Sequence, residues 1–299
     1  MKRHLAILNP AAGGGRCGKL APEAVGRLRK AGLEVEIAET RASGDGVRIA
    51  REAWARGVRN FIAIGGDGTG YEIVNGVFPE ALEAAERPSL GFLPLGTGNS
   101  FLRDFTDQGA EYSIQAMIER KRRPCDVLKL THRDGVLHYI NILSFGFTAE
   151  VAMLTNRRFK SFGPLAYMLG VIVGVTGLDP RPFPMKLDGG RDDREPVTFV
   201  SVNNSRFTGG KMKMAPGANT SDGLMDLVRV GPLGRIALLR TFPKIYEGTH
   251  VDNPAVTVTQ VKAIDFDLAG EIDIMIDGEV LRLHPQRIEV LPSVLDVQA

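Results

Sequence analysis

The sequence predicts an α/β plus β protein, in which an N-terminal three-layer α/β domain precedes a C-terminal antiparallel β-sandwich domain. Short apolar runs alternate with helical patterns through residues 4–93, which is typical of a parallel sheet covered by helices. Beyond Pro124, apolar and polar residues alternate in short runs between turn residues, which favours antiparallel strands. The chain has 299 residues, of which 43% are hydrophobic, so it can form one large core or two medium ones.

The expected parallel strands all end in polar or glycine-rich residues, and helices are expected between them near 20–31 and 46–56. Because the carboxyl ends of parallel strands lie at one edge of a sheet, we expect the loops to meet there, where open α/β sheets bind ligands. The expected strands are His4 to Leu8, Val35 to Ala38, Phe61 to Ile64 and Leu90 to Leu93, and their loops are NPAAGGGR, ETRASGDG, GGDGTG and PLGTGN.

The second half of the chain reads as a β-rich domain. Its expected strands are 127–132, 136–146, 197–204 and 272–283. We place the domain boundary after the basic cluster Arg120 to Arg123. The predicted domains are then 1–123 for the α/β domain, 124–286 for the β-rich domain, and 287–299 for a strand that returns, with a tail.

An uncharged apolar segment, GPLAYMLGVIVGVTGL at 163–178, interrupts the β pattern. It is shorter than the roughly 20 residues of a membrane span. Two interpretations remain: a helix buried between layers, or a helix that flanks an apolar substrate cleft. Arg157, Arg158 and Lys160 precede it and would suit an anionic membrane surface.

Composition excludes several classes of protein. A net charge of +2 argues against a protein that coats nucleic acid, which needs a strong basic excess. Two cysteines make neither a disulfide framework nor a metal cluster. The N-terminal apolar run is too short for a secretory signal. We therefore expect a cytoplasmic protein that at most lies on a membrane.

Glycine-rich loops at 9–16, 65–72 and 96–99 follow successive expected strands. Glycine lets the backbone approach a ligand and present its N–H groups, and the start of a helix favours negative charge. Asp67 would repel phosphate unless it binds a metal ion or polarises a hydroxyl. Each loop alone could be a plain turn with a helix cap, but their coincidence predicts a phosphate site. Neither the P-loop nor the dinucleotide pattern is present.

The stretches NPAAGGGR, GGDGTGYEIVNG and PLGTGNSFLRDF resemble the nucleotide-binding signatures of the diacylglycerol kinase catalytic-domain family, in its bacterial lipid kinase branch. This branch is related to sphingosine and ceramide kinases. TSDGLMDL at 220–227 and IDGEVLRL at 276–283 agree in order and spacing, and GPLAYMLG resembles the family's apolar helix. GGDGT alone is shared with relatives of NAD kinase and 6-phosphofructokinase. The resemblance implies a Rossmann-like α/β domain of the NAD kinase/diacylglycerol kinase type and a β-sandwich.

The resemblance also implies roles for particular residues. Asp222 would help to hold a structural magnesium ion, with the backbone carbonyls of Asn219 and Leu224 as co-ligands. Glu279 matches the family's proton acceptor. Gly70 and Tyr71 are departures, since the family often has Asn at the second position. The residues that would bind the nucleotide and its phosphates are Asn9, Pro10, Ala11, Ala12, Gly13, Arg16, Thr40, Gly66, Asp67, Gly68, Thr69, Glu72, Thr97 and Asn99.

Phosphoryl transfer needs positioning, neutralisation of charge and a carboxylate near the acceptor hydroxyl. Asp67, Asp277 and Glu279 are the candidate catalytic carboxylates. They come from both predicted domains, so we expect the site in an interdomain cleft. Asp277 with Gly278 is also a strong type I′ hairpin signal, and such a turn would fix Glu279 firmly. Asp222 with Gly223 has the alternative of a plain turn.

The function hypothesis is a lipid kinase dependent on ATP and Mg²⁺ that phosphorylates a hydroxyl of a membrane lipid, with diacylglycerol as the first choice. The alternatives are a sphingoid-base or ceramide kinase, a soluble-substrate kinase of the NAD kinase type, and a non-catalytic nucleotide- or lipid-binding module. The expected partner is a lipid substrate at a membrane surface, through peripheral contact. The sequence indicates no nucleic acid and no protein partner, and leaves a homodimer open.

Overall fold

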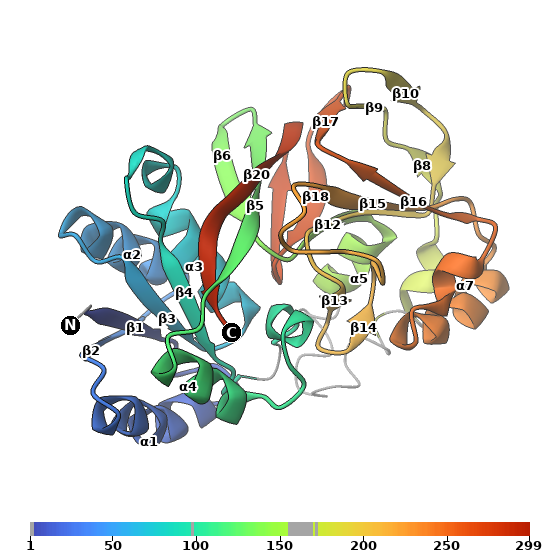
Figure 1. Cartoon of the computed structure of the whole chain (residues 1–299). Coiled ribbons are helices and arrows are strands. Elements are labelled where there is room, and N and C mark those ends of the chain that lie inside the picture. The colour runs from blue at the N-terminus through green and yellow to red at the C-terminus, as the bar shows by residue number, and fades with distance from the viewer. Residues whose placement is uncertain (1–2, 97–98, 155–169, 171–172) are drawn as a thin grey trace. The chain divides into compact units, whose positions relative to one another are not determined.

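The computed structural model describes residues 3–96, 99–154, 170 and 173–299 (Figure 1). The chain forms two compact units, the first made of Met1–Val127 with Pro292–Ala299 and the second of Leu128–Leu291. Residues 292–299 therefore return to the first unit. Thr97 and most of the apolar segment 163–178, with the basic residues that precede it, lie outside the described residues.

The first unit contains a parallel sheet in the order β20-β4-β3-β1-β2. β1, β3 and β4 are short and largely buried, as their apolar runs predict. The C-terminal end of β20 closes one side by pairing with β4 through Asp296 to Gln298. The strands are β1 (His4–Leu8), β2 (Val35–Glu39), β3 (Asn60–Ile64), β4 (Ser89–Leu93) and β20 (Pro285–Gln298).

Helices cover both faces of this sheet and give the three predicted layers (Figure 1). On one face, Leu28 of α1 and Met117 of α4 pack into the core with Ile62 of β3. On the other face, α2 and α3 lie against each other and contact β1. The helices are α1 (Arg16–Lys30), α2 (Asp45–Ala55), α3 (Asp67–Val77) and α4 (Ala110–Ile118), with the short turns η1 (Glu80–Glu83) and η2 (Phe101–Asp104).

Helix α1 begins at Arg16, earlier than the expected start near Leu20. Pro22 lies inside the helix. The backbone N–H that Pro22 lacks would have bonded to Gly18.

The second unit contains an antiparallel sheet in the order β16-β15-β12-β7-β18-β19. A second set of strands pairs in the order β10-β9-β17-β20, and β5 pairs with both β6 and β20. The first sheet consists of β16 (Val256–Val261), β15 (Met225–Val230), β12 (Phe199–Asn203), β7 (Ile142–Gly146), β18 (Ile272–Ile276) and β19 (Glu279–Leu283). The second set adds β10 (Arg191–Asp193), β9 (Met185–Leu187), β17 (Ala263–Phe266), β5 (Arg123–His132) and β6 (Gly135–Tyr139).

Aromatic packing joins the two sets of strands. The ring of Phe145 on β7 lies 4.8 Å from that of Phe183 and 5.9 Å from that of Phe266 on β17, both edge-on. This pairing of sheets is the predicted sandwich. Shorter elements complete the unit: β8 (Arg181–Pro182), β11 (Pro196–Val197), β13 (Phe207–Thr208), β14 (Met212–Lys213), α5 (Phe147–Leu154), α7 (Arg235–Thr241), η5 (Val175–Gly177), η6 (Phe242–Tyr246) and η7 (Thr249–Asp252).

Candidate active site

The loops after the parallel strands meet at one edge of the first unit's sheet. Leu8 pairs with both Glu39 and Ile64, so three strands end at the same level. The Asn9 N–H donates to the carbonyl oxygen of Ile64 at 3.0 Å, and the Thr40 N–H donates to that of Leu8 at 2.9 Å. Bonds between neighbouring loops thus hold the predicted phosphate-binding segments together.

The first loop leads into α1 through Gly13, Gly14 and Gly15, which have positive φ angles of 64°, 66° and 87°. Side chains other than glycine rarely adopt this backbone. A β-carbon on Gly13 would also lie 3.3 Å from the carbonyl oxygen of Leu95, in the fourth loop. Helix α1 starts without a side-chain cap, and Arg16 adds a positive charge there. An uncapped helix start with a neighbouring cation suits an anion.

Asp67 ties the third loop to the fourth. Its carboxylate accepts the backbone N–H groups of Ser100 at 2.9 Å and Phe101 at 3.2 Å. Burial raises the pKa of Asp67, and the two N–H donors oppose that rise. These bonds give Asp67 a positioning role that sequence reasoning missed. Beside it, Thr69 fills the space where Gly65 has no side chain, because a β-carbon there would lie 2.1 Å from the threonine hydroxyl.

Glu72 links the third loop's helix to the second loop. Its carboxylate oxygens accept the N–H groups of Gly44 at 2.8 Å and Gly46 at 2.7 Å. The carboxylate thereby caps the start of α2, where negative charge is favourable. A β-carbon on Gly46, in the first turn of α2, would lie 2.4 Å from the Glu72 carboxylate, so the Glu72 side chain would have to move to admit one.

The side chains of two other predicted nucleotide-binding residues, Asn9 and Asn99, form hydrogen bonds within their own loops. The Asn9 side chain accepts the Ala11 N–H at 3.2 Å, and the Asn99 amide donates to the Gly96 carbonyl oxygen at 3.2 Å. These side chains shape the loops. Contact with a nucleotide therefore remains a prediction for them.

The predicted hairpin in the second unit is present. Ile276 pairs with Glu279, and the two residues between them, Asp277 and Gly278, have φ angles of 44° and 94°. Both angles are positive, as a type I′ turn requires. Glu279 thus begins β19 directly after a tight turn and is partly exposed.

Asp277 is the first residue of this turn and is buried, with an exposed fraction of 1%. Its carboxylate accepts three consecutive backbone N–H groups, those of Ile140 at 3.1 Å, Asn141 at 3.2 Å and Ile142 at 2.8 Å. The expected single strand 136–146 is therefore wrong. The chain divides here into β6 and β7 because the N–H groups bound by Asp277 are not available to a neighbouring strand.

Buried amides surround this break, and sequence reasoning missed them. The Asn204 side chain donates to the Ile140 carbonyl oxygen at 2.8 Å, and the Ser205 hydroxyl donates to the side-chain oxygen of Asn141. All three polar residues are buried. The signal in the sequence is the pair Asn203-Asn204, because buried amides interrupt an apolar strand only where they have partners.

The predicted magnesium loop contains two local turns. The Asp222 carboxylate accepts the Leu224 N–H at 3.0 Å, and the Asn219 side chain accepts the Ser221 N–H at 3.2 Å. Nearby, the pKa of Asp226 is raised to about 6, first by burial and to a smaller extent by the charge of Asp222, while a hydrogen bond with Gln260 opposes the rise. A hard cation would relieve this repulsion and prefers such oxygens, so the loop fits magnesium.

The ligand set would need more than side chains. No three His, Cys, Asp or Glu side chains are grouped for a metal ion anywhere in the described part of the chain. A magnesium ion at Asp222 would therefore depend on backbone carbonyls and water, which magnesium readily retains.

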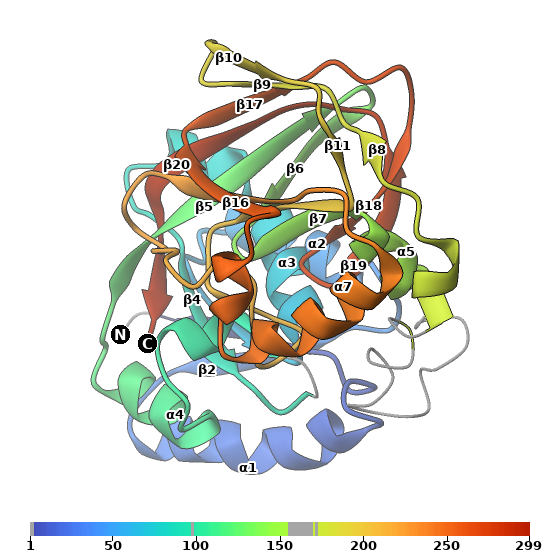
Figure 2. The same ribbon diagram turned by 90° about the vertical axis from the view of Figure 1, so that its right-hand side faces the viewer.

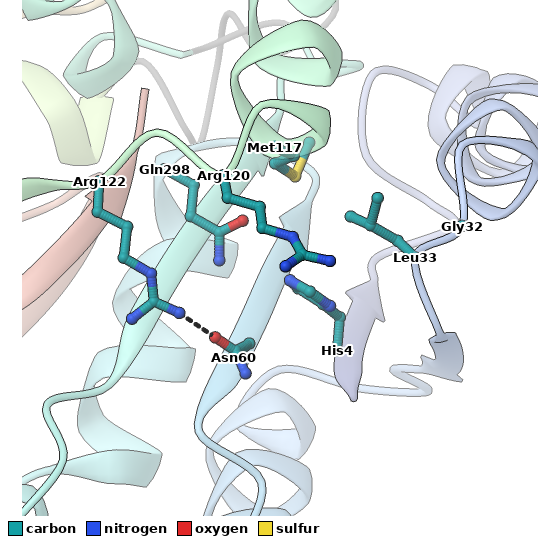
Figure 3. A pocket seen from close by; sticks show the side chains of 8 residues that line it. All are labelled: His4, Gly32, Leu33, Asn60, Met117, Arg120, Arg122 and Gln298. Atoms are coloured by element: carbon teal, nitrogen blue, oxygen red, sulfur yellow. Dashed lines mark hydrogen bonds between the residues drawn. The ribbon is translucent and has the colours of Figure 1, made fainter. Parts of the chain in front are cut away.

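A cavity of about 260 Å³ lies at the opposite, amino edge of the parallel sheet (Figure 3). His4 and Asn60 begin β1 and β3 there, and Arg122 donates to the Asn60 side chain at 2.7 Å. Arg122 also pairs with Asp296 at 3.4 Å. The charge of Arg122 is thus paired with that of Asp296. The cavity lies at a different edge of the sheet from the four loops.

Comparisons with known proteins cover nearly the whole chain. Residues 3–130 match the model of the diacylglycerol kinase catalytic domain, and residues 141–299 match that of the YegS C-terminal NAD kinase beta sandwich-like domain. A diacylglycerol kinase from Mycobacterium tuberculosis is 28% identical over 98% of this chain and 93% of its own length. A YegS-like protein from Chromohalobacter salexigens, named as a lipid kinase, is 31% identical over 93% and 88%.

The fold of this chain is similar to that of a solved structure. It is that of a diacylglycerol kinase candidate from Bacillus anthracis, with a TM-score of 0.82 and 26% identity, and it covers 99% of this chain and 94% of its own.

Proposed function

Since this chain belongs to the family of lipid kinases that join a diacylglycerol kinase catalytic domain to a YegS-type C-terminal domain, we propose that it transfers the γ-phosphoryl group of ATP to a hydroxyl of a membrane lipid, with diacylglycerol as the acceptor. The observation that carries the proposal is the gathering of four strand-end loops, cross-linked by the Asp67 and Glu72 carboxylates. Such loops offer backbone N–H groups to phosphate.

The proposed roles come from residues of both units. The nucleotide phosphates bind to the loops of the first unit, near Gly13 to Arg16 and Gly66 to Thr69. The acceptor hydroxyl oxygen forms a bond to the γ-phosphorus, and the bond between that phosphorus and the β–γ bridging oxygen breaks, which releases ADP. Glu279 of the second unit takes the hydroxyl proton as the new bond forms.

The second unit's loops support this step. Asp277 fixes the turn that carries Glu279, through three N–H bonds. Asp222, with the carbonyls of Asn219 and Leu224, would hold a magnesium ion, and this ion would offset the charge of the buried Asp226. The metal would supply neutralisation of negative charge.

The test is to incubate the purified protein with γ-labelled ATP and a total lipid extract, and to identify the labelled product. Phosphatidic acid is the expected product. A labelled sphingoid base or ceramide would show that the protein is a lipid kinase with an acceptor other than diacylglycerol. Labelled NADP from added NAD would support the soluble-substrate alternative. ATP binding without any transfer would contradict the proposal and favour a binding module.

The variant Glu279→Gln separates catalysis from binding. It keeps the size of the side chain and removes the proton acceptor, so transfer to lipid should fall by about 10²- to 10⁴-fold. ATP affinity should stay unchanged, because the proposed role of Glu279 is to take the proton of the acceptor hydroxyl, whereas the nucleotide phosphates bind to the glycine-rich loops. Full lipid-dependent turnover in this variant would refute Glu279 as the base.

A further inference from the structure

Helix α7 exposes apolar side chains on its outer face. Ile236 is 67% exposed and Leu239 is 40% exposed, and the two lie three residues apart on one side of the helix. Leu238 and Thr241 form the opposite side and are buried in the second unit. Figure 2 shows α7 at the surface, in front of the strands of this unit. A soluble helix normally has the reverse pattern, with polar residues outward.

Neighbouring segments extend this apolar surface. Tyr246, in the turn η6 that follows α7, is 48% exposed and packs edge-on against Phe242. Val173 is 38% exposed and lies two residues before the turn η5. Arg235 of α7 contacts this turn by donating to the Thr176 carbonyl oxygen at 2.8 Å. Tyrosine combines an apolar ring with a polar hydroxyl group, and it is enriched at the interface between membrane and water.

Basic side chains flank the apolar residues. Arg235, Arg240 and Lys244 are exposed, and Arg240 and Lys244 make no ion pair or side-chain hydrogen bond with the residues that the structure describes. Two exposed acids, Glu247 and Asp252, follow them. At about 100° per residue, Arg235 and Arg240 lie on either side of the Ile236–Leu239 stripe. An apolar stripe between cations is the pattern of helices that lie in the surface of an anionic bilayer.

We infer that the α7 surface, defined as Ile236, Leu239 and Tyr246 with Arg235, Arg240 and Lys244, docks the protein onto an anionic lipid bilayer. The inference rests on the proposed function, since a kinase of membrane lipids must reach an acceptor that does not leave the bilayer. The apolar side chains enter the boundary between headgroups and acyl chains, and the cations lie against anionic headgroups. Among the described residues, no helix has the length and apolar character that a membrane crossing requires.

Vesicle binding tests the inference with a matched control. The double variant Ile236→Ser/Leu239→Ser removes the stripe, whereas Leu82→Ser removes a leucine of similar exposure, 42%, from the first unit. Both are sedimented with vesicles of phosphatidylcholine and phosphatidylglycerol. We expect the double variant to bind at least tenfold more weakly and Leu82→Ser to bind as the natural protein does. Equal binding by all three proteins would overturn the inference.

The charge arm of the test uses Arg240→Gln/Lys244→Gln. This variant should bind several-fold more weakly to vesicles with phosphatidylglycerol and should match the natural protein on pure phosphatidylcholine. A change in oligomeric state on size exclusion, with vesicle binding unaltered, would instead make the α7 surface an interface between copies of this chain and would overturn the bilayer assignment.

Activity measurements separate this inference from the proposed function. The Ile236→Ser/Leu239→Ser variant should lose turnover of long-chain diacylglycerol in vesicles and keep turnover of a short-chain diacylglycerol dissolved as monomers. Loss of both activities, with a normal melting temperature, would contradict a role limited to docking. Absence of kinase activity in the natural protein, with vesicle binding intact, would remove the proposed acceptor and leave the docking surface standing.

Discussion

Asp277 and Ile142 bind each other twice. The Ile142 N–H donates to the Asp277 carboxylate at 2.8 Å, and the Asp277 N–H donates to the Ile142 carbonyl oxygen at 2.9 Å. The turn that carries Glu279 is thereby fastened to the start of β7, in the middle of the second unit's sheet. Asp277 therefore differs in role from Glu279, although the two residues stand in one short motif.

Replacement of Asp277 should chiefly lower the stability of the fold. Asp277→Ala leaves three buried N–H groups without their acceptor, which should lower the free energy of unfolding by at least about 3 kcal/mol. Glu279→Gln should leave it within about 0.5 kcal/mol. Urea unfolding of both variants measures the difference. Equal stability of Asp277→Ala and the natural protein would contradict the anchoring role.

Asp67 should affect nucleotide binding more than the transfer step. Asp67→Asn keeps the shape of the side chain but replaces one of the two carboxylate acceptors of the Ser100 and Phe101 N–H groups with a donor. The fourth loop should loosen, and the KM for ATP should rise about tenfold or more, equivalent to about 1.4 kcal/mol. A fall in kcat as large as that of Glu279→Gln, with KM unchanged, would show instead that Asp67 acts on the acceptor.

Gly76 ends the GGDGTGYEIVNG stretch for a reason of packing. A β-carbon there would lie 2.5 Å from the Val47 carbonyl oxygen and 2.6 Å from the Ala50 β-carbon, both on α2. Gly76→Ala should therefore lower the free energy of unfolding by about 1–3 kcal/mol. Gly26→Ala is the matched control, because Gly26 lies in α1 with no atom within 4 Å of the new carbon.

The control variant Gly26→Ala should raise the free energy of unfolding. In Gly26→Ala the added methyl meets no neighbour, and alanine is favoured over glycine in a helix by about 0.5–1 kcal/mol. Thermal unfolding of the two variants in one buffer makes the comparison. A stabilising effect of Gly76→Ala would mean that α2 and α3 can separate without loss.

The parallel strands and their loops could be predicted from the sequence, because short apolar runs are followed by polar or glycine-rich loops, and β1, β3 and β4 are largely buried. β1 begins and ends as expected, at His4 and Leu8. The hairpin at Asp277 was also predictable, because a type I′ turn depends on local residue preferences.

The partners of the carboxylates could not be predicted in this way. Asp67 bonds to Ser100, Glu72 to Gly44, and Asp277 to Ile140, over separations that no local pattern encodes. A carboxylate in a glycine-rich loop suggests ligand binding, yet in this chain these carboxylates accept hydrogen bonds from backbone N–H groups. The α7 surface was missed for a similar reason, since the outer face of a short helix is defined only once its buried face is known.

Acid should destabilise the second unit through His138. This residue is 1% exposed, and burial, with a smaller effect of Lys129, lowers its pKa from 6.5 to about 4. The unfolded chain binds a proton below about pH 6.5 that the folded chain does not bind until about pH 4, so stability falls as the pH drops through this window. Between pH 7 and pH 5 the histidine alone should remove about 2 kcal/mol. His138→Leu should lose this component, so the difference in unfolding free energy between variant and natural protein should shift by that amount between the two pH values. A difference that stays constant with pH would show that the pKa of His138 is the same in the folded and the unfolded chain.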